Sequence, residues 1–366
     1  MTTTTPSRRG FLAGLATGAA VAASSLPAPA ISQGLVSWKM VTTWPKNFPG
    51  LGTGAQRICD RIGALSGGRM EVRLYAAGEL VPAFEAFDAV RDGIAEMTHD
   101  ASYYWVAKHK SMPFFCTVPG GLTAQEHMGW IYHGGGQKLW DELCAEFGMK
   151  AFLAGGSGVQ MGGWFQKEIT GLGDFKGLKM RIPGLGAEVV NRLGATAVNL
   201  PGGEIMPALQ SGVIDATEWV GPWNDLAFGF YKIAKYYYGP GFHEPSSALE
   251  VIVSKDRFEA LPKDLQAAVE NACMAENGYM LSEFTAGNSE AQRILVDKHG
   301  VAIANFPDDV VKAAFDFSVE VVRETATQGD LAKRIFDGWW QVRKDAIARA
   351  PFAEQGYMNN RARGTT

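Results

Sequence analysis

The chain has 366 residues, enough for one large domain or two smaller ones with a well-buried core. Hydrophobic residues make up 46% and charged residues 20%, with 44 Gly and 17 Pro, which excludes a disordered or fibrous protein and a small disulfide scaffold. The formal net charge of -4 provides no basic surface for nucleic acid and no polybasic membrane patch, so we expect neither as a partner.

The first thirty residues have the pattern of an export signal. Arg8 and Arg9 form a twin-arginine pair, a weakly apolar run rich in Ala and Gly follows, and Ala28-Pro29-Ala30 is a small-residue cleavage pattern. A membrane anchor would need about 20 strongly apolar residues, which this run lacks. We therefore predict that residues 1–30 are a Tat signal peptide and that the mature protein is periplasmic.

Alternation of apolar and polar residues predicts strands separated by helices along the first half of the mature chain. The first elements are a strand at 36–42, a helix at 54–65, a strand at 70–75, a helix at 83–92 and a strand at 94–98. Further strands are predicted at 150–153, 159–165 and 178–182. This order of elements predicts an α/β fold with largely parallel sheets.

Two segments of the chain repeat one pattern. Residues 85–98 align with residues 204–217 at a constant offset of 119, and each segment begins with Glu and ends with Thr. Each predicts a helix, a reversal at Gly93 or Gly212, and a strand followed by polar and aromatic residues. Two amphipathic helices can also resemble each other by chance. If the similarity is a true repeat, the chain has two similar lobes with a ligand cleft at the strand ends.

From about residue 256 onward, the composition changes to long amphipathic helices. The predicted helices cover 261–285, 286–299, 308–327 and 329–349. Such a region covers lobes or joins chains, and it carries no obvious chemistry.

Four cysteines could form up to two disulfides in an exported protein, but none lies in a C-x-x-C pair. Apolar helical surroundings favour buried thiols at Cys59 and Cys144, and Tat export of folded proteins weakens the case for disulfides. The pairing state, which also involves Cys116 and Cys273, stays open at this stage.

Two segments in the middle of the chain could recognise an anionic ligand. Gln160 lies beside small residues, where a backbone can approach a ligand closely. Arg181 ends a predicted strand, and its guanidinium could hold a carboxylate through two parallel bonds. A surface charge or an intramolecular ion pair is the alternative for Arg181.

Two carboxylates follow, Glu218 beside tryptophans and Glu244 after a Gly-Phe-His run. With the side-chain carbonyl of Gln160 and one main-chain carbonyl, they would form an oxygen-only shell that suits Ca²⁺ or Na⁺ and not zinc. A cation there would bridge the protein carboxylates to a ligand carboxylate. Exposed loop glutamates without an ion are the alternative.

A serine hydrolase is the rival enzyme hypothesis. The run His133-Gly134-Gly135-Gly136 imitates an esterase oxyanion loop, and Ser157 stands between two glycines. The final glycine of G-x-S-x-G is missing, and the two segments lie too near in sequence for the usual sheet to separate them. We therefore expect no enzyme. A sensory binding protein that uses the same cleft without transport also stays open.

Five motifs resemble the periplasmic solute-binding subunits of TRAP transporters, the DctP family. They occur in the family's order and cover essentially the whole mature chain: residues 77–82, 158–165, 177–181, 215–222 and 236–238. The chain is most similar to the branch that binds 2-oxo and 2-hydroxy monocarboxylates, such as pyruvate and lactate, with a metal ion in the cleft.

This resemblance implies a two-lobe Venus-flytrap fold with long C-terminal helices, often in a helix-swapped homodimer, that delivers its ligand to membrane permease subunits. The expected lobes are 31–157 plus 247–290 and 158–246 plus 291–366.

The resemblance also assigns roles to individual residues. Gln160, Glu218, the Trp219 main chain and Glu244 would hold the cation, Na⁺ or Ca²⁺, and Arg181 would hold the substrate carboxylate.

Secondary substrate contacts would come from Tyr103 and Asn224. The chain departs from its relatives at Phe242-His243, where we expect tryptophans. His243 therefore changes the apolar end of the expected pocket and leaves the ligand's identity open.

Overall fold

The computed structural model describes residue 1 and residues 34–364, and its second compact unit begins at Val36. Residues 2–30 of the predicted export signal therefore lie outside the described residues. Within the described part, no helix is both long and apolar enough to cross a membrane.

The first sheet has five strands in the order β2-β1-β3-β10-β4. Its strands are β1 (Val36–Thr42), β2 (Met70–Tyr75), β3 (Met97–Asp100), β4 (Met149–Gly156) and β10 (Ala248–Ser254). Strand β1 runs parallel to both β2 and β3, whereas β10 runs antiparallel to both β3 and β4. A strand from late in the chain thus completes a sheet built by its beginning.

The second sheet has six short strands in the order β11-β9-β5-β8-β6-β7. They are β5 (Gly163–Phe165), β6 (Lys179–Arg181), β7 (Thr196–Val198), β8 (Ala216–Thr217), β9 (Tyr236–Tyr238) and β11 (Ala302–Ala304). The central β5 is antiparallel to both neighbours. The fold is therefore α/β with largely parallel sheets, as predicted, and each sheet contains one strand, β10 or β5, that runs in the opposite direction.

The two similar segments share their local geometry. Gly93 and Gly212 have φ angles of 76° and 74°, in the left-handed region that favours glycine. In the first segment the Ala89 carbonyl accepts bonds from the next two N–H groups after the turn, and Ala208 does the same in the second. Each helix therefore reverses into its strand in the same way.

A second correspondence ties each turn to the neighbouring strand. The Lys39 N–H donates to a Glu96 carboxylate oxygen at 2.8 Å, and the Lys179 N–H donates to Asp215 at 3.0 Å. The two lysine ammonium groups cap carbonyls in their turns, at Ile94 and Gly212. The two sheets are thus built around equivalent helix–turn–strand units, as two related lobes require.

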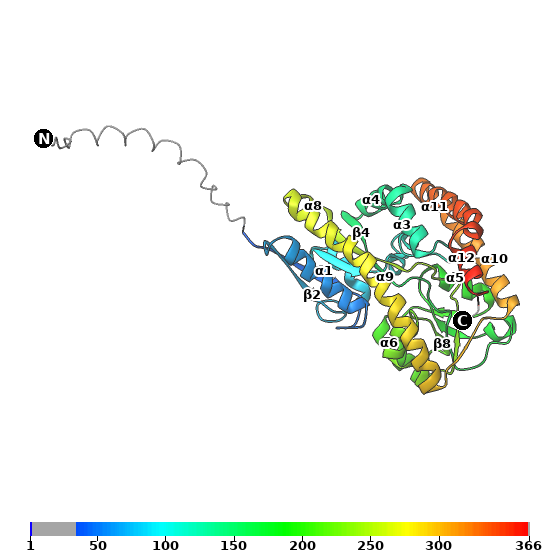
Figure 1. Ribbon diagram of the computed structural model, residues 1–366. Helices are drawn as coiled ribbons and strands as arrows, with labels where there is room; N and C mark the ends of the chain where they lie inside the picture. The colour runs from blue at the N-terminus through cyan, green and yellow to red at the C-terminus, as the bar shows by residue number, and fades with distance from the viewer. Residues whose placement is uncertain (2–33, 365–366) are drawn as a thin grey trace. The chain divides into compact units, whose positions relative to one another are not determined.

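Helices surround the two sheets (Figure 1). They are α1 (Leu51–Leu65), α2 (Ala86–Arg91), α3 (Ala124–His133), α4 (Gly136–Ala145), α5 (Gly184–Leu193), α6 (Gly202–Ser211), α7 (Pro222–Phe228), α8 (Lys255–Glu259), α9 (Lys263–His299), α10 (Asp308–Glu324), α11 (Asp330–Arg349) and α12 (Glu354–Arg361). Most predicted bounds are right to within a few residues. The predicted strand at 159–165 is shorter, since only its last three residues pair.

Helix α9 is one continuous helix of 37 residues where the sequence predicted two. The helix continues through residue 286, and the next residue, Gly287, lies directly against the Trp223 ring. The helix contacts α1 and β4 near its start and α7 further along, so it spans elements of both sheets (Figure 1).

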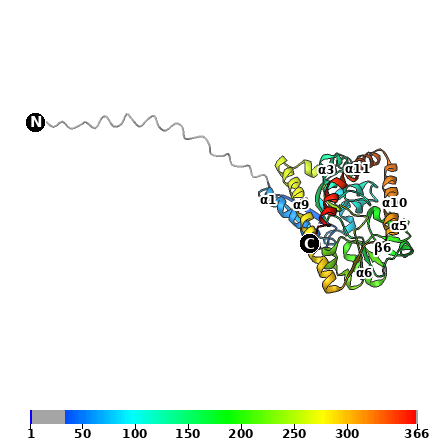
Figure 2. The ribbon, with the colours of Figure 1, turned by 45° about the vertical axis from the view of Figure 1, so that its right-hand side comes forward.

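The C-terminal helices also contact both halves of the chain. Helix α10 packs against α5 and α11 packs against α3, as Figure 2 shows from a second side, and α11 also packs against α4. Arg334 on α11 forms an ion pair with Glu142 on α4. These helices act as covering elements, in line with the sequence prediction.

All four cysteines are buried and unpaired. Burial raises the pKa of each thiol above its ordinary value, which makes the thiols poor nucleophiles. The structure thus settles the pairing question in favour of buried thiols.

Two acidic side chains meet in the middle of the first sheet. Glu250 on β10 lies directly opposite Asp100 on β3, and both are fully buried. Asp100 accepts bonds from the Trp105 indole at 2.9 Å and from the Thr98 hydroxyl at 2.7 Å, whereas neither Glu250 oxygen has a donor. Burial and the nearby Asp100 raise the pKa of Glu250, so we infer that the pair shares a proton.

This pair predicts that stability depends on pH. The thiols of Cys116 and Cys144 also approach Glu250, and none of these neighbours supplies a positive charge. Because the folded-state pKa lies above the unfolded value of 4.5, the folded protein retains a proton that the unfolded chain loses as the pH rises. The stabilisation that Glu250 contributes is fully present below its unfolded-state pKa of 4.5 and is lost as the pH rises above that value.

We expect Glu250→Gln to flatten the pH dependence, because the amide keeps a donor for Asp100 without ionising. At about pH 8 the variant should be more stable than the wild type by about 1–3 kcal/mol in urea unfolding. The exposed Glu259→Gln on α8 serves as the control and should follow the wild-type curve. If the free energy of unfolding changed equally with pH in the wild type and in Glu250→Gln, from about pH 5 to 8, that result would contradict a shared proton.

Candidate functional site

Four predicted site residues converge at one edge of the second sheet. Arg181 ends β6, and Glu218 directly follows β8, which pairs with β6 in parallel. Gln160 precedes β5, and Glu244 follows β9, the two strands on the other side of β8. All four side chains are buried, with exposed fractions of 3% or less. The alternative of solvated loop glutamates is therefore wrong.

Arg181 and Glu218 form a buried ion pair through Nη1 and Oε1. The same Nη1 donates to the Glu218 carbonyl at 3.2 Å, and Nε donates to the Leu200 carbonyl at 3.0 Å. The guanidinium carbon also lies 5.2 Å from the Trp219 ring centre. Nη2 is buried without an acceptor. The intramolecular ion pair considered for Arg181 thus exists, yet it leaves one edge of the guanidinium available for a ligand.

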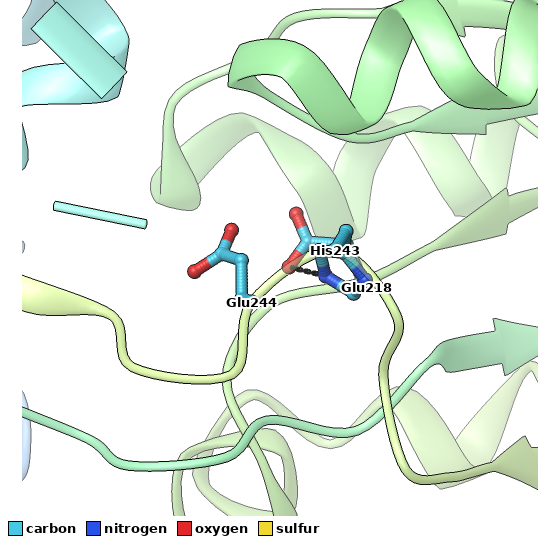
Figure 3. Close-up of side chains that lie close together, drawn as sticks. All are labelled: Glu218, His243 and Glu244. Carbon is cyan, nitrogen blue, oxygen red and sulfur yellow. Dashed lines mark hydrogen bonds and ion pairs between the residues drawn. The ribbon is translucent and has the colours of Figure 1, made fainter. Parts of the chain in front are cut away.

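Glu218, His243 and Glu244 form a cluster whose ligand atoms all lie within 4.8 Å of one another (Figure 3). His243 Nε2 lies 3.3 Å from Glu218 Oε2, and the Glu244 carboxylate extends into the space beside Glu218. Burial raises the pKa of Glu244, and the Glu218 charge raises it further. Burial alone would lower the pKa of His243, but its contact with Glu218 raises it. Two carboxylates and one imidazole are therefore crowded into one buried cluster.

Gln160 is fixed by both its main chain and its side chain. Its N–H donates to the Glu244 carbonyl at 3.0 Å, and its carbonyl accepts from Gly241 N–H at 2.8 Å. The side-chain Nε2 donates to the Ser157 hydroxyl at 3.2 Å, which leaves Oε1 as a buried acceptor without a donor. A buried carbonyl oxygen with no donor is suited to a cation or to a ligand hydroxyl.

Trp219, Tyr103 and Asn224 lie where the elements of the two sheets meet, but they face different neighbours. The Trp219 ring contacts Trp44 and Phe48 from the first half of the chain, at centroid distances of 6.3 and 6.2 Å. Tyr103 is buried against the glutamate cluster. Asn224 instead donates to the Pro49 carbonyl at 3.0 Å and lines neither of the two small cavities that border the site.

Two small cavities of about 10 Å³ each border this site. One is lined by Trp44, Leu51, Tyr103, Tyr104, Ser157, Gln160, Trp219, Val220 and Leu249. The other is lined by Tyr103, Thr117, Pro119, Pro183, Gly184, Leu185, Gly186, His243 and Glu244. Each has room for about one water, so the two sides must separate to admit an organic ligand.

A larger cavity of about 380 Å³ lies elsewhere, beside the β5–β6 region of the second sheet. It contains none of the predicted site residues. Its lining includes exposed Lys and Glu side chains with no convergence of buried polar atoms, so size alone does not identify the site.

Trp44 and Tyr104 line the first cavity and were missed by sequence reasoning. Trp44 lies two residues after the end of β1, and its ring contacts the Trp219 ring from the second half of the site. Its indole donates to His99 at 2.8 Å, and His99 in turn contacts the Ala154 carbonyl, so its ring is held firmly. A position at a strand's carboxyl end was the available signal.

The hydrolase hypothesis finds no support in the geometry. The Ser157 hydroxyl contacts Gln160 Nε2 and the Gly158 carbonyl, while His133 is exposed at the end of α3. In the described part of the chain, no hydrogen bond joins Ser157 to a histidine. Ser157 therefore orients Gln160 and lacks the base that a nucleophile needs.

Comparison with known proteins shows a close match along most of the chain. The family model for bacterial extracellular solute-binding protein, family 7 (DctP), matches residues 40–328. The monocarboxylate 2-oxoacid-binding periplasmic protein of Nostoc sp. PCC 7120 is 40% identical over 347 residues, which cover 94% of each chain.

Two solved structures are also similar over their lengths. One is a TRAP transporter solute-binding protein from Bordetella bronchiseptica RB50, a dimer with copurified calcium and picolinate; it has a TM-score of 0.87 and 37% identity, over 89% of this chain and 97% of that one.

The other is a TRAP periplasmic solute-binding protein from Pseudoalteromonas atlantica T6c with bound sodium and pyruvate; it has a TM-score of 0.86 and 38% identity, over 89% and 99% of the two chains. The recognised two-lobe fold is thereby confirmed, and the family is one of transport receptors, not of enzymes. The chain belongs to family 7 of the bacterial extracellular solute-binding proteins, the DctP-type receptors of TRAP transporters.

Proposed function

We propose that this receptor binds a small 2-oxo or 2-hydroxy monocarboxylate, such as pyruvate or lactate, together with Na⁺ or Ca²⁺. The ligand would lie between the two sheets and be delivered to the membrane permease subunits of a TRAP transporter. The names of the Nostoc, Bordetella and Pseudoalteromonas relatives support this ligand class, since each binds a compact carboxylate or 2-oxoacid.

One observation carries the proposal: a buried acceptor and a buried donor, both unpaired, belong to the same group of residues. Gln160 Oε1 lacks a donor, and Arg181 Nη2 lacks an acceptor. Buried polar groups are normally paired, and leaving one unpaired costs about 1–3 kcal/mol. A cation at Gln160 and a carboxylate at Arg181 would satisfy both groups with a single ion–ligand complex.

The donor set fits a hard cation. The Glu218 and Glu244 carboxylates and the Gln160 amide supply buried oxygen atoms, and we propose that these atoms and the Trp219 main chain hold the cation. The cation would offset the repulsion between the two carboxylates, of which Glu218 contacts both Arg181 and His243. When bound, it would also attract the carboxylate and the 2-oxo or 2-hydroxy oxygen of the ligand.

The two sides of the site suggest how binding drives closure. Trp44 and Tyr103 come from segments that follow strands of the first sheet, whereas Gln160 and Trp219 belong to the second. A ligand that contacts both sides binds the closed state more tightly than the open state, and only this difference shifts the population. We propose lobes of 31–157 plus 247–290 and 158–246 plus 291–366, with the C-terminal helices extending across both.

His243 and Asn224 are proposed as secondary substrate contacts. His243 lines the second cavity with Nδ1 unpaired, and Asn224 Oδ1 is likewise buried and unpaired. Either atom could meet a ligand once the lobes rearrange around it. We also propose Tat-dependent export, on the twin-arginine signal Arg8-Arg9.

A homodimer through the C-terminal helices is a further part of the proposal. Several apolar side chains of this region are exposed, and one similar structure is a dimer. They are Ile347, Phe352, Tyr357 and Met358, of which Phe352 is 92% exposed. Exposed clusters of this kind favour contact with a second chain.

Removal of the cation tests the metal part of the site. After exhaustive chelation and exchange into sodium-free buffer, isothermal calorimetry should show pyruvate affinity reduced at least about tenfold, restored by Ca²⁺ or Na⁺. Glu218→Gln should weaken the restored binding because it removes a charged ligand. Full affinity in the metal-free wild type would disprove the cation's role.

Arg181→Lys tests the carboxylate contact while keeping the charge that faces Glu218. Lysine lacks the guanidinium fork, so pyruvate affinity should fall about tenfold or more in calorimetry. Arg192→Lys, at an ion pair on the surface, is the matched control and should bind like the wild type. If Arg181→Lys and Arg192→Lys bound pyruvate equally well, Arg181 would not be the residue that holds the ligand carboxylate.

The dimer is tested by light scattering of the purified mature protein. We expect twice the chain mass, because a second chain would cover the exposed apolar side chains of the C-terminal region; a stable interface buries about 1,000 Å² or more of total surface. The double variant Phe352→Ser/Tyr357→Ser should be monomeric. A wild-type monomer at micromolar concentration counts against this assembly.

A further inference from the structure

Asp225 is a buried acid close to the site that no sequence motif singled out. It lies on α7 with 1% of its surface exposed. Four donors surround its carboxylate: Trp164 Nε1 at 2.9 Å and Tyr237 Oη at 2.7 Å contact Oδ2, and the Val220 and Gly221 N–H groups contact Oδ1 at 3.3 and 3.2 Å.

No Lys, Arg or His in the described part of the chain forms an ion pair with Asp225. Burial of a carboxylate is costly, and here hydrogen bonds alone compensate for it. A neutral side chain could fill this space at a lower cost, so the carboxylate calls for an explanation beyond packing.

The four donors come from the segments that carry the proposed cation ligands. Val220 and Gly221 directly follow Glu218 and Trp219 in the chain. Trp164 on β5 lies four residues after Gln160, and Tyr237 on β9 lies seven residues before Glu244.

The strand pairing strengthens this link. Trp164 and Tyr237 are direct cross-strand partners with stacked rings at 4.0 Å, and Trp164 also pairs with Thr217, the residue before Glu218. One carboxylate therefore links three segments that also meet through strand pairing and through the stacked Trp164 and Tyr237 rings.

The turn after Glu218 is held from both sides. Asp225 accepts the Val220 N–H, while the Val220 carbonyl accepts the Met161 N–H at 3.1 Å. This fixes the peptide that follows Trp219 relative to the segment that carries Gln160. Rotation of that peptide would move the Trp219 carbonyl, which belongs to it, relative to the segment that carries Gln160.

We infer that Asp225 is a positioning residue that sets the Glu218–Gly221 turn, and with it the geometry of the proposed cation ligands. The inference rests on the proposed function. Asp225 touches neither the cation nor the substrate in this account. It acts through the main chain of Val220 and Gly221 and through the Trp164–Tyr237 pair.

The test compares Asp225→Asn with Asp100→Asn. Asp100 is also fully buried and accepts bonds from the Trp105 indole at 2.9 Å and the Thr98 hydroxyl at 2.7 Å, but neither donor belongs to a segment that carries a proposed cation ligand. Ca²⁺-dependent pyruvate binding is measured by calorimetry at a temperature where circular dichroism shows each variant fully folded. We expect Asp225→Asn to weaken pyruvate affinity about tenfold or more and to raise the Ca²⁺ concentration needed for half-maximal binding.

Asp100→Asn should change both binding quantities by less than about twofold, whatever its effect on the melting temperature. Tyr237→Phe, which leaves the carboxylate with three donors, should give a smaller loss of about two- to fivefold. If Asp225→Asn does not fold, Tyr237→Phe decides alone, and wild-type affinity in that variant overturns the inference.

Two results separate this inference from the function on which it rests. Should Glu218→Gln lose binding while Asp225→Asn binds like the wild type, the positioning role fails and the proposed function stands. Should both variants bind like the wild type, the proposed site itself is wrong. Equal losses in Asp100→Asn and Asp225→Asn would show general destabilisation and also overturn the positioning role.

Discussion

The buried contact between Arg181 and Glu218 is the interaction on which the rest of the site depends. Removing one partner of a buried ion pair leaves an uncompensated charge at a cost of about 3–5 kcal/mol, so neither residue is a passive wall of the cavity. The two residues also differ in how completely their polar atoms are paired. Glu218 meets both Arg181 and His243, while Arg181 keeps one buried nitrogen without an acceptor. The ion pair therefore stabilises this part of the fold, while one buried hydrogen-bond donor of Arg181 stays unpaired. A ligand carboxylate can pair with that donor.

The chain achieves this convergence with two related helix–turn–strand units. Each reverses at a glycine near +75° and delivers polar groups to the end of a strand, one unit in each sheet. Because β6 and β8 run in parallel, Arg181 and Glu218 emerge side by side, and the antiparallel β5 brings Gln160 from the opposite direction. The ligand side chains thus come from segments far apart in sequence. Main-chain bonds between Gln160, Gly241 and Glu244 then hold these segments together.

Much of this arrangement could be predicted from sequence, because it depends on local patterns. Strand alternation located β1 and β2 to the residue, the repeated Glu-to-Thr segment indicated two lobes, and residue chemistry selected Gln160, Arg181, Glu218 and Glu244. What could not be predicted depends on pairing between distant segments. The reversed direction of β10, the unbroken α9, and the burial of Glu250 against Asp100 are decided by tertiary contacts that leave no local periodicity. Asp225 was missed for the same reason, since its four donors come from three separate segments.

A crystal structure of the mature protein grown with pyruvate and Ca²⁺ tests the central claim most directly. The account predicts anomalous density for one cation bonded to Gln160 Oε1, Glu218 and Glu244, with the pyruvate carboxylate on Arg181 and the same ion. Pyruvate bound in the cavity beside β5 and β6, or bound near Arg181 with no cation between it and the glutamates, would contradict the account.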